Sequence, residues 1–424
     1  MAEVEVPPYF LCPISLQIMR DPVTLSTGIT YDRESIERWI FSEKHDVCPV
    51  TKQPLCPVDP ELTPNHTLRR LTQSWCAANA SSGIERFPTP RQPVNRAQVV
   101  RLLEEAKLPH SQISTFRKLK SIVAESDRNK RCVEAAGAVD FLVSVIMNAT
   151  NYLIREQQEG GGGEELWERL EPSTRACDEA LLILHSLQIS EQSRATVIQK
   201  NAGFIDTLAA IMSRSNYRSR AHAVQILKSL LSVMTPTQKI NTSKQLIEEV
   251  VDVVEDRVSY PAVKAALQIL AMICTSDRRN KVMAVEAGAV PAMIELLLDE
   301  TEKRVCEMAL MALDQLCGCA EGRAALADHA AGMAVVSKKI LRVSEVASEM
   351  AVRVLHSLAK YSATKAVADE MLQVGVVSKM FLVLSQVNCG LKTKEKAREI
   401  VKLHARVWRE SPCLGHFKHY YSSS

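Results

Sequence analysis

Metal binding is the first chemistry to consider, because the first 76 residues hold several side chains of the zinc-ligating types. The candidates are Cys12, Cys48, Cys56 and Cys76, with His45 and His66. A RING-type zinc site needs C-x2-C pairs, since two cysteines in one turn supply half of a tetrahedral site. Here 35, 7 and 19 residues separate successive cysteines, and no C-x2-C occurs. We therefore expect no metal in this segment.

A catalytic nucleophile is the second chemistry to consider. Residues 11–40, LCPISLQIMRDPVTLSTGITYDRESIERWI, contain one cysteine, no histidine and no Ser-His-Asp set, so they carry no obvious catalyst. Farther along, LCGCAEG contains the C-x-C pair Cys317 and Cys319. No further ligand is nearby, so we interpret the pair as plain cysteines at a helix end, with metal or redox chemistry as the alternative.

The elements that must position this segment are short. PVTLSTGITY is β-branched on both sides of Thr27-Gly28, which predicts a hairpin after a turn at Asp21-Pro22. Asp32 is expected to cap a helix. The residues that follow Asp32 at helical spacing are Ser35, Ile36, Trp39 and Ile40.

A second loop and a last helix complete this part of the chain. The loop SEKHDVCPVTKQPL has its path fixed by Pro49 and Pro54, and Asn65 is expected to cap the helix. The face of that helix would hold Leu68, Leu71, Trp75 and Ala78. Two loops flanking a helix on a hairpin is the plan of a zinc RING.

Without zinc, the loops must be fixed by hydrogen bonds and salt bridges among residues such as Asp21, Asp32, Arg33, Glu34 and Ser35. Which of these residues pair cannot be read from the sequence.

Composition limits the classes of protein that the chain can be. At 424 residues it is too long for one compact core. A net charge of +3 with 24% charged residues argues against a strongly basic nucleic-acid binder. The sequence contains no run of 18 or more apolar residues, so we expect no transmembrane helix. The first ten residues, MAEVEVPPYF, lack an apolar h-region, so we expect no secretory signal. The cysteines are therefore expected to be reduced.

Beyond residue 96 the chain repeats itself. The segments FRKLKSI, LLILHSL, VQILKSL, LQILAMI, LMALDQL and VRVLHSL align on a column of leucines: Leu119, Leu184, Leu227, Leu270, Leu313 and Leu355. Four of the five spacings are 42 or 43 residues, a period typical of armadillo or HEAT solenoids. Five copies then have a glycine expected to end the following short helix: Gly137, Gly203, Gly288, Gly332 and Gly375.

These patterns divide the chain into regions. We expect a small domain over residues 5–80, a linker over 81–96, about six repeats over 97–410 and a tail over 411–424. The first leucine spacing is 65 residues, and the surplus matches a Gly-rich insertion near 151–172 containing Gly160–Gly163. We expect a flexible surface spacer there, with an interaction loop as the alternative.

The first domain resembles a known family. FLCPISLQIMRDPVTLSTGITYDRESIERWI, CPVTKQPL and LTPNHTLRRLTQSWC look like a plant-type U-box, the metal-free relative of the RING. With the repeats, the chain resembles plant U-box/armadillo E3 ubiquitin ligases. The resemblance implies a mostly α fold, in which a small α+β U-box precedes an armadillo-type α-solenoid. It also implies that the nucleophilic cysteine belongs to the E2, and that no cofactor is needed.

The resemblance also supplies candidate site residues. Ile14 and Leu16 in the first loop, Trp39 on the helix and Pro49 in the second loop are expected to dock the E2. Trp39 could instead be a core residue. Lys52 lies where many members have an arginine that bonds both E2 and ubiquitin, so a bridging role is expected. Lysine lacks the planar fork, and an ordinary loop lysine is the alternative.

The repeats lack the Trp and Asn ladders of armadillo proteins that bind extended peptides, so their concave face is expected to dock protein substrates. The helix at 393–408 is expected to cap the solenoid. We expect a cytoplasmic E3 that works with ubiquitin-charged E2 and also ubiquitylates itself. Nucleic acid is not expected as a partner, and a homo-oligomer stays open. The resemblance implies stress or immune signalling; the alternative is a non-catalytic adaptor.

Overall fold

The computed structural model describes residues 6–43, 45–55, 62–80, 84, 94–158, 164–201, 203–240, 242–387 and 389–409. Cys56, most of the expected linker, Gly160–Gly163 and the expected tail at 411–424 lie outside the described residues. The chain forms two compact units, Met1–Ala138 and Val139–Ser424.

The first unit is built on a three-stranded antiparallel sheet. A 3-10 turn, η1 (Pro8–Phe10), precedes β1 (Pro22–Thr24), β2 (Thr30–Asp32) and, later, β3 (Thr63–Pro64). The strand order is β2-β1-β3, so β1 is central, and Val23 pairs with Tyr31 on one side and Pro64 on the other. The predicted hairpin is confirmed. Its turn uses Gly28 at φ +82°, a conformation that costs glycine little.

Two helices flank this sheet. α1 (Arg33–Glu37) continues as the π-helical turn η2 (Arg38–Ser42), and α2 (His66–Ala78) follows β3. The predicted cap of α2 is confirmed, since the Asn65 side chain accepts the N–H of Leu68 at 3.0 Å. The core between sheet, helices and loops consists of Cys12, Met19, Val23, Leu25, Tyr31, Ile36, Cys48, Leu55 and Leu62.

The predicted cap of α1 is wrong in its detail. Asp32 stands at the N-cap position, but its side chain does not bond the helix. Its Oδ1 instead accepts the N–H groups of Arg20 and Asp21, at 2.8 and 2.9 Å. The carboxylate therefore fixes the end of the first loop, a tertiary contact that the capping rule cannot anticipate.

The rest of the chain is helical. The first unit continues with α3 (Arg96–Glu105), α4 (Pro109–Glu125) and α5 (Asp127–Ala135). The second unit contains α6 (Ala138–Gln158, which starts at the unit boundary), α7 (Glu164–Leu187), α8 (Glu191–Lys200), α9 (Phe204–Met212), α10 (Tyr217–Leu231), α11 (Pro236–Ile240), α12 (Lys244–Glu255), α13 (Tyr260–Ser276), α14 (Arg278–Glu286), α15 (Ala289–Asp299), α16 (Lys303–Leu316), α17 (Ala320–Asp328), α18 (Gly332–Lys339), α19 (Glu345–Tyr361), α20 (Lys365–Gln373), α21 (Val376–Ser385), α22 (Leu391–Leu403) and α23 (Ala405–Arg409).

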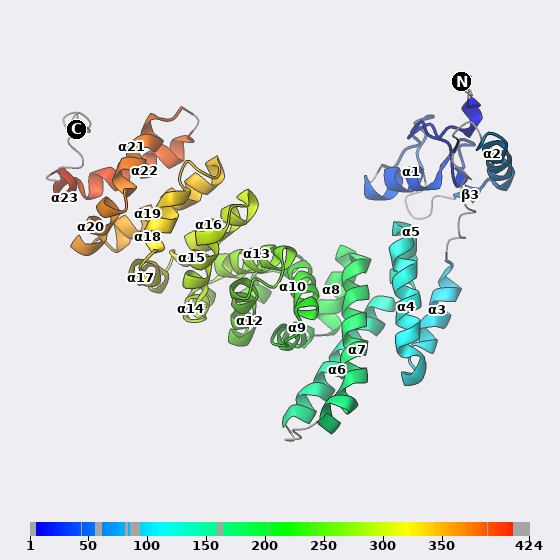
Figure 1. The fold of residues 1–424 in the computed structure, drawn as a ribbon, viewed down its shortest axis with the longest axis horizontal. Helices are drawn as coiled ribbons and strands as arrows, with labels where there is room; N and C mark the ends of the chain where they lie inside the picture. The colour runs from blue at the N-terminus through cyan, green and yellow to red at the C-terminus, as the bar shows by residue number, and fades with distance from the viewer. Residues whose placement is uncertain are drawn as a thin grey trace. The chain divides into compact units, whose positions relative to one another are not determined.

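Within the second unit the helices stack in repeats of three. The third helices pack each against the next, in the order α7, α10, α13, α16, α19 and α22 (Figure 1). The second helices form another row, in the order α9, α12, α15, α18 and α21. We call the surface of the row of third helices the third-helix face. The predicted leucine column is confirmed, because each of the six leucines is at most 1% exposed. No repeat can bury this column alone, so the repeats depend on their neighbours.

The glycines of the repeats take more than one role. Gly137, Gly288 and Gly375 adopt left-handed φ angles of +88°, +82° and +74° between helices, where a side chain would be strained. The prediction is wrong for Gly203 and Gly332, which do not adopt positive φ. At Gly332 the constraint is space, since a Cβ would lie 2.4 Å from the carbonyl oxygen of Leu326.

The two irregular segments differ from expectation. α6 reaches Gln158 and α7 starts at Glu164, so most of the expected insertion at 151–172 is helix. The expected helix at 393–408 breaks at His404 into α22 and α23. Trp408 is buried there, and its Nε1 donates to the carbonyl of Ala368 at 3.0 Å. In the described part of the chain, no single helix is long and apolar enough to cross a membrane; the bent pair α5 and α6 passes by length and composition alone.

Candidate functional site

The two loops beside α1 are copies of one structure. Residues 12–17 read CPISLQ and residues 48–53 read CPVTKQ. In each, the cysteine N–H donates to the glutamine carbonyl at 2.8 Å, and the fifth residue donates its N–H back to the cysteine carbonyl, at 2.8 and 2.9 Å. That fifth residue, Leu16 or Lys52, has a φ of +56° or +57°. Such left-handed backbone is uncommon outside glycine, so both loops hold a specific shape.

The cysteine sulfurs anchor the loops to the sheet. Cys12 Sγ accepts the N–H of Asp32 at 3.3 Å. Cys48 Sγ lies 3.1 Å from the Tyr31 hydroxyl and accepts a bond from Thr27 Oγ1 at 3.4 Å. The Tyr31 oxygen also accepts the N–H of Val50 at 3.3 Å, so its own proton is directed to the sulfur. A buried hydroxyl therefore holds the second loop.

This arrangement favours the Cys48 thiolate. Burial raises the pKa of Cys48, but hydrogen bonds from Thr27, Thr51 and Tyr31 outweigh it and lower the pKa to about 6. Burial and the bond to Cys48 raise the pKa of Tyr31 above its usual range, so the phenol stays protonated and donates. Both sulfurs are fully buried, which removes them as nucleophiles for an external substrate.

An ionic cluster joins the first loop to both helices. Asp21 pairs with Arg33 at 2.6 Å and, through its other oxygen, with Arg69 on α2. Arg33 also lies 3.7 Å from Glu37. Burial raises the pKa of Glu37, and the positive charge of Arg33 offsets only part of this rise. All four side chains are largely buried, where an ion pair is screened little by salt.

The sequence predicted this network in part. Asp21, Asp32 and Arg33 do take part in it. Glu34 does not: it pairs with Arg38 at 3.2 Å on the exposed side of the helix. The sequence did not point to Arg69, because this residue belongs to a different element, α2, and lies 48 residues after its partner Asp21.

The predicted docking residues are placed by these loops and by η2. Ile14 and Trp39 are half-buried and pack against the same core, whereas Leu16 is 74% exposed. Trp39 Nε1 donates to the carbonyl of Val47 at 2.9 Å, which ties the helix to the second loop. Trp39 also stacks on His45, with ring centroids 3.8 Å apart. Their role in docking stays a prediction.

The second loop presents the other predicted residues. Pro49 is half-buried and Lys52 is exposed, and the Lys52 ammonium has no ion-pair partner among the described residues. Sequence reasoning missed Val50, which is 52% exposed. The repeat of CPISLQ in CPVTKQ contains the signal that would have found it, because Val50 corresponds to Ile14.

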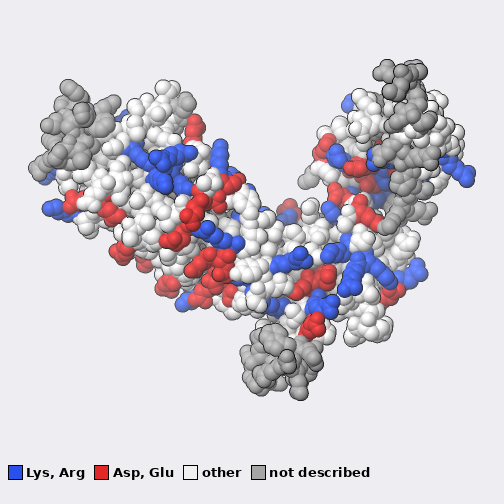
Figure 2. All heavy atoms as spheres, viewed as in Figure 1, with Lys and Arg blue, Asp and Glu red and all other residues white. Residues whose placement is uncertain are grey.

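Other chemistry finds little support in the described residues. They contain no group of three or more His, Cys, Asp or Glu side chains that could hold a metal ion. Cys317 and Cys319 are buried at helix ends, as predicted, and Cys319 Sγ caps α17 by accepting the N–H of Gly322. Lysines, arginines and acidic residues are interspersed over the face seen in Figure 2.

The small sheet with its two matched loops, followed by repeats of three helices, is the arrangement of a U-box followed by armadillo repeats. Residues 6–81 match the U-box domain, and residues 98–422 match the plant U-box protein ARM repeat region. The chain belongs to this family of plant U-box proteins with ARM repeats.

Known proteins are similar over the whole length. The E3 ubiquitin-protein ligases PUB22 and PUB23 of Arabidopsis thaliana are 48% and 49% identical, over 97% of this chain and 97% and 96% of theirs. A solved structure described as "A conserved phosphorylation switch controls the interaction between cadherin and beta-catenin in vitro and in vivo" is 12% identical. It has a TM-score of 0.58 and covers 80% of this chain and 59% of that chain, which supports the solenoid fold alone.

Proposed function

We propose that the U-box docks a ubiquitin-charged E2 through Ile14, Leu16, Trp39 and Pro49, while the armadillo repeats recruit the substrate. The observation that carries the proposal is the pair of matched loops, which hold apolar side chains outward beside Trp39. Leu16 and Val50 stay exposed although a soluble protein gains by burying such residues. An exposed apolar patch of this kind is a signature of a binding surface.

The reaction needs positioning from this chain and no nucleophile. The substrate lysine attacks the thioester carbonyl that joins ubiquitin to the E2 cysteine. An isopeptide bond forms, and the E2 thiolate leaves and takes up a proton. Lys52 would contact both E2 and ubiquitin and restrain the ubiquitin in its reactive pose. Orienting two reactants in this way supplies rate without an acid or base.

The remaining parts of the proposal concern partners and setting. The third-helix face would bind substrate, and the ligase would also ubiquitylate itself. A cytoplasmic protein acting in plant stress or immune signalling fits the resemblance. Self-association is left open.

Reconstitution with E1, E2, ubiquitin and ATP tests the proposal. The full chain should form ubiquitin conjugates on itself, and a variant with Ile14→Arg should not. A non-catalytic adaptor would bind its partners and give no conjugates with any of several E2 enzymes. That outcome would overturn the proposal.

A further inference from the structure

A cavity of about 400 Å³ lies on the third-helix face, where α7, α8 and α10 meet. Three side chains with basic nitrogens line it: His185, Arg194 and Lys228. Every lining residue is described, and none of them is Asp or Glu. The cavity therefore concentrates positive charge, with no acidic residue in its lining to balance it.

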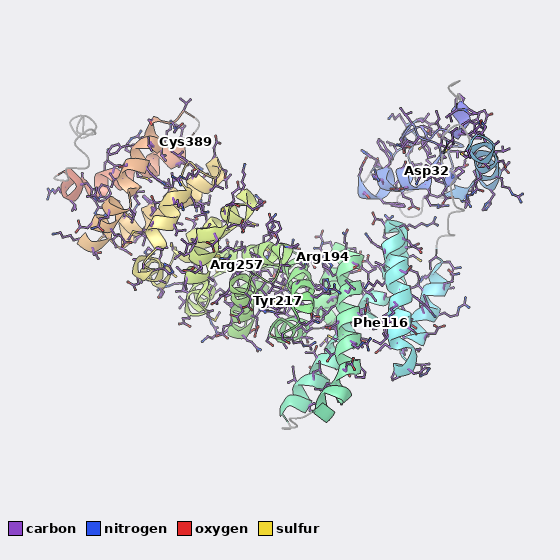
Figure 3. All side chains as sticks on the ribbon, in the orientation of Figure 1. Asp32, Phe116, Arg194, Tyr217, Arg257 and Cys389 are labelled. Atoms are coloured by element: carbon purple, nitrogen blue, oxygen red, sulfur yellow. The ribbon has the colours of Figure 1, made fainter. Side chains whose placement is uncertain are left out.

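Arg194 is held in place while part of its hydrogen-bonding capacity is unused. It reaches from α8 to the end of α10, where Nη1 donates to the Ser229 carbonyl at 3.0 Å and to Ser232 Oγ at 2.9 Å (Figure 3). Its Nε is buried and has no hydrogen-bond partner among the described residues. The guanidinium is therefore not fully paired within the protein, and an anionic oxygen is the acceptor that a guanidinium binds best.

The fold contains a matched site in which the same charge is neutralised. Lys281 is the fourth residue of α14, as Arg194 is the fourth residue of α8. Asp314 follows the column leucine in α16, where Lys228 follows it in α10. Asp314 pairs with Arg353 at 2.7 Å and also interacts electrostatically with Lys281.

In the cavity, lysine replaces that aspartate. Lys228 makes no ion pair with any described residue. His185 Nε2 lies 3.0 Å from the neutral Gln225 amide oxygen, and the His185 ring lies 5.1 Å from the His222 ring. An ion from solution or from a partner is the remaining source of negative charge.

We propose that this cavity binds the phosphate of a phosphorylated serine or threonine in a protein substrate. The inference rests on the proposed function, because it takes the third-helix face as the substrate surface. A phosphate offers three strong acceptor oxygens to the nitrogens of Arg194 and Lys228. The amide of Gln188 lines the same cavity and suits the backbone of an extended peptide, whereas the Gln225 amide is engaged by His185 and by the Ala221 carbonyl. The apolar residues of the lining, Leu184, Ile189 and Ile226, are buried, so the lining offers no exposed apolar side chain of the kind that membrane binding uses.

The test is a binding measurement with the full chain, independent of ubiquitin transfer. The probes are two fluorescent pools of degenerate peptides, one with a central phosphoserine or phosphothreonine and one with serine or threonine. Charge-assisted hydrogen bonds should make the phosphorylated pool bind about ten-fold more tightly or better. Inorganic phosphate should compete with it.

Two variants and one matched control make the result specific. Lys228→Gln changes a partly exposed residue and should remove most of the preference for phosphate; Arg194→Gln should do the same if thermal unfolding shows it to be folded. Lys264→Gln removes the same charge from the same face. It should keep the preference, because the Lys264 ammonium already lies 3.9 Å from Glu302 and 4.2 Å from the Tyr260 ring.

Three outcomes would overturn the inference. The pools could bind equally, the control could lose as much as Lys228→Gln, or only vesicles containing phosphatidylinositol phosphates could bind. If any of these occurs while substrate ubiquitylation still requires the repeats, this inference fails and the proposed function stands.

Discussion

The hydroxyl of Tyr31 holds the second loop of the U-box, and Tyr31→Phe removes it with little change in volume. The oxygen contacts Cys48 Sγ at 3.1 Å and the Val50 N–H at 3.3 Å. Both partners belong to the loop that carries Pro49 and Lys52. The variant should therefore keep its core packing and lose two of the bonds that attach this loop to the sheet, while the bond from Thr27 to Cys48 remains.

The size of the effect follows from the two bonds. The bond to the Val50 N–H is between neutral groups and is worth about 1 kcal/mol, and the bond to the ionised sulfur about 1.5–3 kcal/mol. The loss of both lowers the free energy of opening the loop by roughly 2.5–4 kcal/mol. At about 1.36 kcal/mol for each factor of ten, the open state becomes roughly 70 to 1,000 times more populated.

Hydrogen–deuterium exchange of the Val50 amide measures this opening directly. In the Tyr31→Phe variant, peptides covering residues 47–55 should exchange faster by that factor, and E2-dependent ubiquitylation should fall. Tyr9→Phe is the matched control, because Tyr9 is 64% exposed and should change neither readout. Unchanged exchange at Val50 in the Tyr31 variant would refute the assignment of the loop's stability to this hydroxyl.

Three further predictions test other parts of the account. Discharge of ubiquitin from pre-charged E2 to free lysine, which needs no ATP, and the melting temperature should survive excess EDTA; loss of discharge that zinc restores would contradict the expected metal independence. Because the pKa of Cys48 falls from 9.0 to about 6 on folding, the unfolded chain binds more protons between these values. Urea unfolding of the U-box should thus show stability rising from pH 6 to pH 9, and a Cys48→Ser variant with the same rise would disprove the cause. Lys52→Ala should slow discharge of charged E2 to free lysine by about ten- to a hundred-fold, the loss of roughly 1.5–3 kcal/mol, with binding of uncharged E2 nearly intact. Lys52→Arg should match or exceed wild type, and equal discharge by wild type and Lys52→Ala would make Lys52 an ordinary loop lysine.

Local and periodic features of the fold could be predicted from the sequence. The leucine column, at 42- to 43-residue spacing from Leu184 onward, located the buried third helices α7, α10, α13, α16 and α19, because burial of one face imposes that period. Thr27-Gly28 located the hairpin and Asn65 the start of α2, since both signals act within a few residues. In each case the residues that carry the signal also form the structure.

Features that depend on distant partners could not be predicted. Asp32 looks like a helix cap, yet its carboxylate bonds Arg20 and Asp21 instead. Gly332 looks like a helix end, yet it is required by the approach of the Leu326 carbonyl. The pairing of Asp21 with Arg69 joins elements 48 residues apart. Sequence periodicity contains no information on such contacts. It also contains none on contacts with a partner protein, so the E2-docking residues were assigned by resemblance.

The central claim is that the U-box acts by docking charged E2 on a surface patch that contains the half-buried Ile14. The most direct measurement is the single-turnover discharge of ubiquitin from charged E2 to free lysine, with wild-type chain and with Ile14→Arg. A charge placed in the interface without a partner costs several kcal/mol, so discharge by the variant should fall to the rate without E3 while its melting temperature stays within a few degrees of wild type. Discharge by the variant at the wild-type rate would contradict the docking assignment. A large fall in melting temperature would instead make Ile14 part of the core.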